Sequence, residues 1–350
     1  MTHFTEIHSA TIAPVNPWLI ACLSREVGRT SPVGVVADKH RVVLFRDATG
    51  KPAALEDRCA HRNSPLSMGS VKDGALTCRY HGWTYARDGA VKNIPALCER
   101  DRPHAEFRVR RYYAAEQEGF VWIALSDIPP DDPPPRFPNL GRAGWTSFIM
   151  KTRFEAPMDA CLENFLDCPH ATFLHRYWFR APTAKPVKAT VRTLTDGVEA
   201  EFFEEPREKS VVWWLLAPRR GPMRHTDRFI APRTSCVDYQ FPSGLHYTIT
   251  SSCTALSDAE TEVYTVITFR YGRIGPLVRV LFEPLARRII RQDVEMLGAQ
   301  YHNVTRFGGP RFANTRADLF GPHIAAWRRA LESGEPPPAA GDQRDVDLQL

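Results

Sequence analysis

The stretch that decides the fold holds two cysteines and two histidines: Cys59-Ala-His-Arg-Asn-Ser-Pro-Leu-Ser-Met-Gly69, followed by Leu76-Thr-Cys-Arg-Tyr-His-Gly-Trp-Thr-Tyr85. Cys59 and His61 form one close pair, Cys78 and His81 form a second, and sixteen residues separate the pairs. Two ligands on one turn can reach the same metal centre, and a second turn completes the ligand set. The spacing therefore predicts a metal site in this part of the chain.

The mixture of ligand types within each pair indicates which metal centre is bound. Structural Cys2His2 zinc sites more often pair like with like, a Cys pair with a His pair. One sulfur and one nitrogen per pair is typical of a [2Fe–2S] centre in which two imidazoles replace two thiolates on one iron. We interpret the four residues as [2Fe–2S] ligands, with zinc as the alternative.

Both segments resemble the cluster-binding signature of the Rieske non-haem iron oxygenases. They lack the additional cysteine that each loop carries in the Rieske proteins of respiratory cytochrome complexes. Helical stretches mixed with strand-like runs, without a βαβ alternation, predict an α+β protein. An N-terminal antiparallel β domain would hold the cluster, and a helix-grip-like catalytic domain would follow, with an antiparallel sheet and flanking helices.

Length, charge and hydropathy narrow the class of protein. A chain of 350 residues suggests two domains, and its net charge of +5 is too small for a nucleic-acid footprint. The longest apolar run, Val211–Ala217, is far shorter than the ~20 residues that span a bilayer. Eight cysteines are too few for a disulfide scaffold. Since the N-terminus shows no secretory pattern, we expect a cytoplasmic protein without nucleic-acid or membrane partners.

Turn signals and proline-rich segments suggest where the domains end. Short apolar runs separated by turns continue to Leu125, and the proline-rich Pro129–Pro135 follows them. We expect an N-terminal extension (1–15), a Rieske domain (16–128), a catalytic domain (129–335) and a flexible tail (336–350). In the catalytic domain the patterns predict helices at 159–167 and 276–306 and strands within 190–203, 210–216, 247–252 and 262–269.

A second candidate metal site lies in the stretch Glu163-Asn-Phe-Leu-Asp-Cys-Pro-His-Ala-Thr-Phe-Leu-His175. Its spacing resembles the mononuclear-iron motif of the same family, which implies that His170 and His175 are iron ligands. Asn164, Asp167 and His170 step by three and would share one helix face. His175 would lie ~140° from His170 on an ideal helix, so their convergence needs a distortion, for which Pro169 gives a reason.

A ferrous site of this type needs a carboxylate as its third ligand. Asp293 has apolar neighbours at helical spacing, which places a carboxylate on an apolar face and makes it costly without a partner. Glu295 shares a face with Arg291 and is typical of a solvated surface pair. This segment also resembles the family's third-ligand segment, so Asp293 is preferred over Glu295.

Two further residues of the motif are assigned through the resemblance. It implies that Asp167 is not a ligand but bridges His170 to His81 of a neighbouring subunit in a homotrimer, coupling the two metals. Local hydrogen bonding at a helix end is the alternative for Asp167. We expect Asn164 to contact the iron ligands without binding the metal itself.

The resemblance implies a terminal oxygenase that uses O2 at Fe(II). Because no dinucleotide-binding fingerprint is present, electrons would come from a separate NAD(P)H-dependent reductase, with or without a ferredoxin. The sequence of the first loop and the length of the chain resemble those of vanillate demethylase-like enzymes. This resemblance favours hydroxylation or oxidative demethylation of a small apolar or aromatic molecule. A cis-dihydroxylating ring dioxygenase and a non-enzymatic ferredoxin-like electron carrier are the alternatives.

Two groups of side chains have less specific interpretations. The basic stretch Arg108–Arg111 could dock an acidic electron donor, although such runs are usually solvated. Five aromatic residues of the second domain could line a pocket, and core packing is favoured for them: Trp178, Phe202, Phe203, Trp213 and Trp214.

Overall fold

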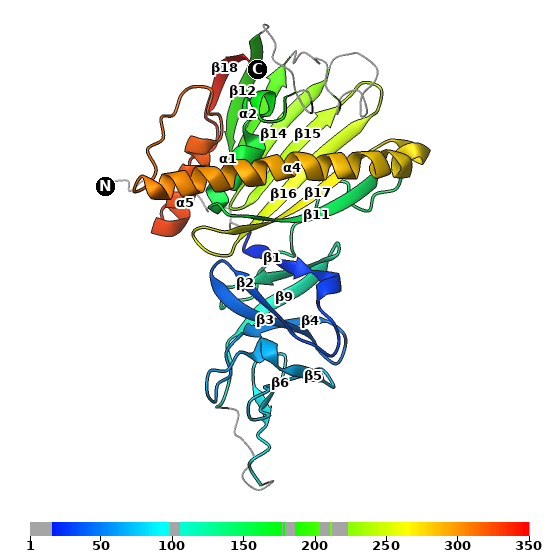
Figure 1. The fold of residues 1–350 in the computed structure, drawn as a ribbon, viewed down its shortest axis with the longest axis vertical. Helices are drawn as coiled ribbons and strands as arrows, with labels where there is room; N and C mark the ends of the chain where they lie inside the picture. Colours follow the sequence, from blue (N-terminus) through cyan, green and yellow to red (C-terminus); the bar gives the residue numbers. More distant parts are fainter. Residues whose placement is uncertain are drawn as a thin grey trace, which may run out of the picture.

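The computed structural model describes residues 16–98, 106–176, 178, 186–203, 211 and 223–349. The lower part in Figure 1 contains two antiparallel sheets. The first has the order β1-β10-β9-β4-β3-β2, with the bounds Trp18–Leu23, Phe120–Ala124, Arg111–Gln117, Pro52–Glu56, His40–Arg46 and Val33–Ala37. The second has the order β5-β6-β7-β8, with the bounds Ser70–Lys72, Ala75–Thr77, Thr84–Tyr85 and Val91–Asn93. The lower part is the antiparallel β domain expected from the sequence.

The β3–β4 hairpin shows how local sequence sets this part. Its turn is closed by Asp47, whose carboxylate accepts hydrogen bonds from the backbone N–H groups of Thr49 and Lys51. Gly50 takes a φ of 83°, a left-handed conformation that favours glycine. The apolar run that ends near Leu125 forms β10, and every residue of this strand is buried.

The upper part is built on one eight-stranded antiparallel sheet with the order β11-β17-β16-β15-β14-β13-β12-β18. Its strands are Thr146–Phe154, Thr261–Phe269, His246–Ala255, Thr234–Gln240, Arg224–Ile230, Gly197–Phe203, Pro186–Leu194 and Gln343–Gln349. The helices are α1 (Met158–Leu166), α2 (His170–Phe173), α4 (Gly275–Arg306) and α5 (Gly321–Ser333), with 3-10 turns at Ser24–Glu26, Leu66–Met68 and Gly272–Ile274. The helix α4 runs across the strands in Figure 1. This is the α+β catalytic architecture expected.

The prediction of a flexible tail at 336–350 is wrong for residues 343–349, which form β18. β18 pairs along its length with β12 and forms the edge of the large sheet. Val346 and Leu348 alternate with polar residues and are buried. Because a single edge strand needs only one apolar face, two apolar residues at alternate positions suffice, and the composition of the segment concealed them.

Three further predictions about strands have different outcomes. The run 190–203 forms two strands, because Gly197 starts β13 with a φ of 153°. The run 210–216 lies outside the described residues, except for 211. The strands β14 and β15 were not predicted, although both lie in the middle of the sheet.

The two parts pack against each other through a shared apolar cluster. Trp18, Ile20, Phe120 and Trp122 of the lower part contact Tyr264 and Val266 of β17, which point away from the helices of the upper part. The Thr254 hydroxyl donates to the Ile20 carbonyl at 2.8 Å. An ion pair between Arg233 and Asp38, 2.7 Å apart, adds a second link. The predicted boundary at residues 128–129 falls between β10 and β11 and remains a prediction.

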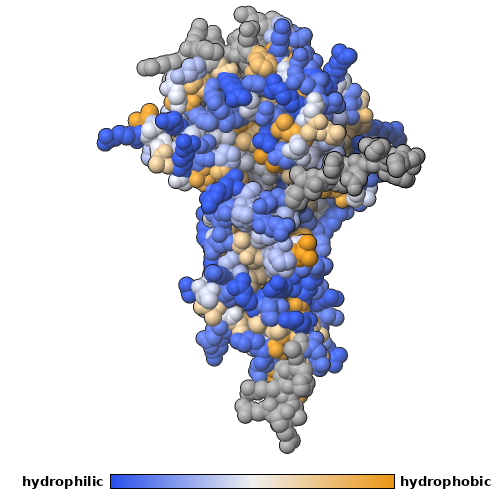
Figure 2. Space-filling model, turned by 180° about the vertical axis from the view of Figure 1, so that it is seen from behind, coloured by the Kyte–Doolittle hydropathy of each residue, from blue (hydrophilic) through white to orange (hydrophobic). Residues whose placement is uncertain are grey.

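The surface of the described residues is mainly hydrophilic on the side shown in Figure 2, with scattered apolar side chains. None of the helices in the described ranges is both long and apolar enough to cross a membrane.

Candidate metal centres

Two turns with the same backbone pattern carry the N-terminal cysteine and histidine pairs. Cys59 lies between β4 and β5, and Cys78 lies between β6 and β7. Each cysteine carbonyl accepts a hydrogen bond from the N–H group four residues later, that of Asn63 or Gly82. Both of those residues have a positive φ, 56° and 72°, which folds each turn back toward its cysteine. The two pairs are therefore presented by matching loops.

The side chains on these loops fit a cluster with two sulfur and two imidazole ligands. Cys59 and Cys78 are buried and free, and their thiols are neighbours. Burial raises the pKa of Cys78, and Cys59 adds to this, so thiolates here need a nearby cation. The rings of His61 and His81 lie 4.6 Å apart between centroids. The buried Nδ1 atom of His61 has no hydrogen-bond partner among the described residues, as expected for an atom that binds metal.

Neighbouring aromatic groups hold this donor set. The Tyr85 hydroxyl lies 3.0 Å from the Cys59 sulfur and accepts a hydrogen bond from the Ala60 N–H. His61 stacks on Trp83 with their planes 3° apart. Its pKa is lowered by burial and by the charges of His81 and Arg62, which keeps the imidazole neutral and able to bind a metal. His81 is exposed, so the imidazole side of the site faces outward.

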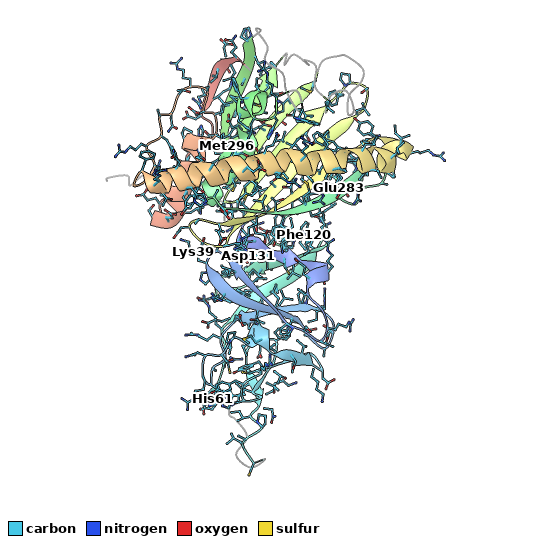
Figure 3. All side chains as sticks on the ribbon, viewed as in Figure 1. Lys39, His61, Phe120, Asp131, Glu283 and Met296 are labelled. Atoms are coloured by element: carbon cyan, nitrogen blue, oxygen red, sulfur yellow. The ribbon has the colours of Figure 1, made fainter. Side chains whose placement is uncertain are left out.

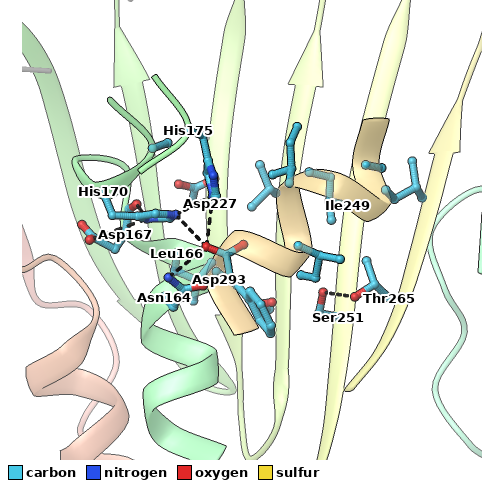
Figure 4. Close-up of a pocket in the computed structure, with 18 of the residues that line it drawn as sticks. Asn164, Leu166, Asp167, His170, His175, Asp227, Ile249, Ser251, Thr265 and Asp293 are labelled. Carbon is cyan, nitrogen blue, oxygen red and sulfur yellow. Dashed lines mark hydrogen bonds and ion pairs between the residues drawn. The ribbon is translucent and has the colours of Figure 1, made fainter. Parts of the chain in front are cut away.

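The second donor set lies in the upper part of the molecule. His170 begins α2, His175 follows that helix, and Asp293 projects from α4. Figure 4 shows the two imidazoles and the carboxylate pointing toward one another. His175 and Asp293 are only 4% and 6% exposed. The structure thus brings together the three residues predicted from the sequence, whereas Glu295 is exposed.

The spacing of the donor atoms fits one metal ion. Asp293 Oδ1 lies 3.0 Å from His175 Nε2 and 3.6 Å from His170 Nε2, and the two nitrogens are 3.3 Å apart. Ligands bound at about 2.1 Å on one face of an ion would lie about 3 Å from each other. Two imidazoles and one carboxylate are the ligand set of non-haem Fe(II) sites that keep open positions.

Other side chains fix the orientation of these donors. The Gln292 side-chain oxygen accepts from His175 Nδ1 at 2.9 Å, which leaves Nε2 facing Asp293. The Asn164 amide donates a hydrogen bond to Asp293 Oδ1 at 3.4 Å. Asn164 thus lies beside one of the three donor residues. Burial lowers the pKa of His175, but its hydrogen bond to Asp293, the charge of that carboxylate and Gln292 outweigh burial and raise it. The imidazole therefore prefers a positively charged state or a bound cation.

The prediction that Asn164, Asp167 and His170 share one helix face is wrong. α1 ends at Leu166, and Asp167 is its C-cap with extended backbone angles. His170 then begins a separate four-residue helix directly after Pro169. Since proline disfavours helical geometry in the residue before it, the chain turns at this point. The break brings His170 and His175 together.

Asp167 lies beside His170 on the outer side of the site. His170 Nδ1 donates to the Asp167 backbone carbonyl, and the Asp167 carboxylate is 3.7 Å from the same nitrogen. The Asp167 side chain is 39% exposed.

A cavity of about 130 Å³ extends from the second donor set between the sheet and the helices. Its roof includes Phe282, Ala286, Ile289 and Ile290 of α4, and its floor is the inner face of β14 to β17. Of the aromatic residues considered from the sequence, Phe202 is buried in the core and Phe203 is 40% exposed. Trp178 packs under Arg288, 4.9 Å from its ring centre. Trp213 and Trp214 lie outside the described residues.

Sequence reasoning missed four residues near these centres: Tyr85, His225, Asp227 and Gln292. Asp227 is buried, lines the cavity, and lies within 4.8 Å of donor atoms of His225 and Cys168, which makes a second group of possible metal donors. His225, Asp227 and Phe229 stand at alternate positions, which places them on one face of a strand. This pattern in the sequence could have indicated that His225 and Asp227 face inward. Nothing in the helix pattern singles out Gln292.

Family models match both parts of the chain. A model described as Rieske [2Fe-2S] domain matches residues 17–112, and one described as vanillate O-demethylase oxygenase C-terminal domain matches residues 154–334. The protein TIC 55 of Arabidopsis thaliana is 33% identical over 297 residues, which are 81% of this chain and 52% of the relative. Chlorophyllide a oxygenase of Oryza sativa subsp. japonica is 30% identical over 335 residues, or 93% of this chain and 60% of the relative. The chain thus spans only part of the length of these relatives.

Solved structures share the fold. Dicamba monooxygenase bound to dicamba superposes with a TM-score of 0.76 at 21% identity, covering 91% of this chain and 98% of that one. NdmA of Pseudomonas putida CBB5 gives a TM-score of 0.69 at 20% identity, with 91% and 90% covered. Two matching turns for a [2Fe–2S] cluster, a two-histidine and one-carboxylate site, and both family models lead to one conclusion: the chain belongs to the Rieske non-haem iron oxygenases of the vanillate O-demethylase type, a family whose cofactors are a [2Fe–2S] cluster and a mononuclear iron.

Proposed function

We propose that this chain is a terminal oxygenase that hydroxylates or oxidatively demethylates a small apolar or aromatic molecule with O2. The observation that carries the proposal is the donor set of His170, His175 and Asp293 at the end of a mostly apolar cavity. Fe(II) bound by these residues would supply the site for O2 chemistry, and a [2Fe–2S] cluster in the N-terminal part would supply single electrons. Cys59, His61, Cys78 and His81 are the proposed cluster ligands.

The residues around the second site have separable roles in this proposal. Gln292 holds the His175 ring so that Nε2 faces the metal, and Asn164 holds the Asp293 carboxylate. The apolar side chains of α4 exclude water from the cavity and orient an apolar substrate. Asp167 holds the His170 ring through Nδ1.

We further propose that electrons pass between subunits of a homotrimer, from His81 of one chain through Asp167 to His170 of the next. In Figure 3, His61 lies near the lower end of the molecule, whereas the helices that carry the second site lie in the upper part. The exposed positions of His81 and Asp167 suit a contact with another chain. A separate NAD(P)H-dependent reductase, with or without a ferredoxin, would reduce the cluster. Arg108 and Arg110 already pair with Asp88 and Asp127, so docking of an acidic donor at this stretch stays a prediction.

Metal analysis and product analysis test the proposal together. We expect about three irons and two acid-labile sulfides per chain, two irons in the cluster and one at the second site. With a reductase, NADH and a panel of methoxylated and methylated ring compounds, we expect O2-dependent release of formaldehyde or a hydroxylated product. A cis-diol would instead favour the ring dioxygenase. Two irons without a third would favour the electron carrier, and zinc without sulfide would contradict the proposal.

Single substitutions separate the two centres. Asp293→Ala should lose one iron per chain and all turnover but keep the visible absorption of the cluster, because the cluster has its own ligands. Glu295→Ala is the matched control on the same helix, since Glu295 is exposed. Retention of the third iron in Asp293→Ala, with its loss in Glu295→Ala, would reverse the ligand assignment.

A further inference from the structure

The cavity floor consists of rows of side chains that run across neighbouring strands. One row contains His225, Tyr239 and Tyr247, and another contains Ser235, Ser251 and Thr265. The row between them is Asp227, Val237, Ile249 and Ile267, paired in register from β14 to β17. Asp227 is therefore the one carboxylate at the end of an otherwise aliphatic row in the described floor.

A fixed imidazole holds Asp227. His225 Nε2 donates to Asp227 Oδ1 at 2.8 Å. The His225 ring is fully buried between Phe202 and Tyr239, with centroids 4.4 and 4.2 Å away and nearly parallel planes. Four aromatic rings in consecutive strands, Phe202, His225, Tyr239 and Tyr247, thus form a rigid ladder beneath the carboxylate. Rigid support of this kind is typical of a side chain that must keep one position.

Among the described residues, the second oxygen of Asp227 has one partner, and a weak one. The Cys168 thiol donates to Oδ2 at 3.5 Å, which is long and involves a weak donor. Asp227 is 2% exposed, and the described residues that line the cavity include no lysine or arginine. A buried carboxylate is costly unless partners reach both of its oxygens, and His225 reaches only Oδ1. Figure 4 shows Asp227 on the same side of the cavity as His170 and His175, and all three residues line it.

We propose that Asp227 is a substrate-binding residue, which selects single-ring molecules that carry an O–H or N–H donor and disfavours aromatic carboxylates. This inference rests on the proposed function, because it assigns the substrate class of the same cavity. An O–H or N–H group would donate to Oδ2, whereas a carboxylate would bring acceptor oxygens with no proton to donate against the Asp227 carboxylate. The cavity of about 130 Å³ is similar to the about 150 Å³ of an apolar cavity that holds benzene, so a molecule with one ring fits it.

Binding of three matched probes to the holoprotein tests this inference. The probes are 4-methoxyphenol, 4-methoxyaniline and 4-methoxybenzoate, which share a ring and a methoxy group and differ in the para group. Dissociation constants are measured by calorimetry at pH 7.5, without reductant. We expect the phenol and the aniline to bind at least tenfold more tightly than the benzoate. In Asp227→Asn the ratio should fall below about threefold, mainly because the benzoate binds more tightly.

Control variants separate recognition from structure. Asp227→Glu keeps the charge and should keep the preference against the benzoate. Ser251→Ala changes the hydroxyl row of the same floor and should shift all three constants alike. Iron content and cluster absorption of each variant establish that the site is intact.

Three results would overturn the inference. These are benzoate binding to the unmodified protein as tightly as the phenol, an unchanged ratio in an intact Asp227→Asn, and no binding by any probe. Equal binding of the benzoate and the phenol, or no binding by any probe, is measured on the unmodified protein. These two results therefore test the inference even if Asp227→Asn does not fold. Failure of the proposed function would show as absence of the third iron. Failure of this inference alone would show as missing selectivity with that iron present.

Discussion

At the scale of single residues, the Tyr85 hydroxyl is placed to tune the cluster. It lies 3.0 Å from the Cys59 sulfur and can donate a hydrogen bond to it. Such bonds stabilise the more negative, reduced state of a cluster. A hydrogen bond worth about 1 kcal/mol corresponds to about 40 mV for one electron, so Tyr85→Phe should lower the midpoint potential by roughly that amount. A redox titration followed by visible absorption measures this, with Tyr80→Phe as the exposed control beside His81. Equal shifts in both variants would contradict a specific role for Tyr85.

A second residue-scale prediction concerns Gln292. Its side-chain oxygen holds His175 Nδ1, and Gln292→Leu removes the acceptor while keeping most of the volume. Loss of a group that orients a metal ligand typically costs about 10- to 100-fold in metal affinity. We expect this loss in an iron titration of the apoprotein. Gln300→Leu, an exposed change on the same helix, should have no effect. Unchanged iron affinity in Gln292→Leu would mean that the backbone alone fixes the orientation of the His175 imidazole.

At the scale of elements, we expect the edge strand β18 to contribute measurably to the free energy of unfolding. Leu348 is 3% exposed and lies on the sheet's inner face with Val346. Leu348→Ala should lower the free energy of unfolding by about 2 kcal/mol, the low end for a buried Leu→Ala change, because an edge strand can adjust. Thermal or urea unfolding measures the loss. Asp347→Ala, on the outer face of the same strand, should change it by less than about 0.5 kcal/mol. No difference between the two would mean that the tail contributes no packing.

The sequence predicted α1, α4 and the two turns that carry the cysteine and histidine pairs, because closely spaced Cys and His residues and apolar periodicity are local signals. It missed β14 and β15 for a physical reason connected with the cavity. Their inward positions include His225, Asp227 and Ser235, and these strands form part of the cavity floor. A strand that lines a cavity loses the alternation of apolar and polar residues by which strands are recognised. Gln292 and Asp227 become apparent only when the sheet and α4 come together, so no local pattern contains them.

At the scale of the whole molecule, the positions of the two centres make a prediction about mixed oligomers. Asp167→Asn keeps its shape but cannot accept hydrogen bonds from two imidazoles, so it should keep its iron and lose nearly all turnover. His81→Ala should lose the cluster. Neither variant alone should be active, but a mixture with exchanged subunits should recover part of the activity, because some contacts join an intact Asp167 to an intact His81. An inactive mixture with verified exchange would contradict electron transfer between subunits.

The apolar cluster shared by the two parts has a consequence for how such proteins diversify. Trp18, Phe120 and Trp122 pack directly on the back of the strand whose front side includes Thr265 and Ile267 of the cavity. A Rieske part taken from a relative would therefore have to match this contact before it could serve another catalytic sheet. Exchange of electron-transfer modules should leave exposed tryptophan and phenylalanine at a mismatched seam, with aggregation as the outcome. Because successive residues of β17 face opposite sides, one substitution in this strand alters the contact between the two parts, and a substitution at the next position alters the cavity.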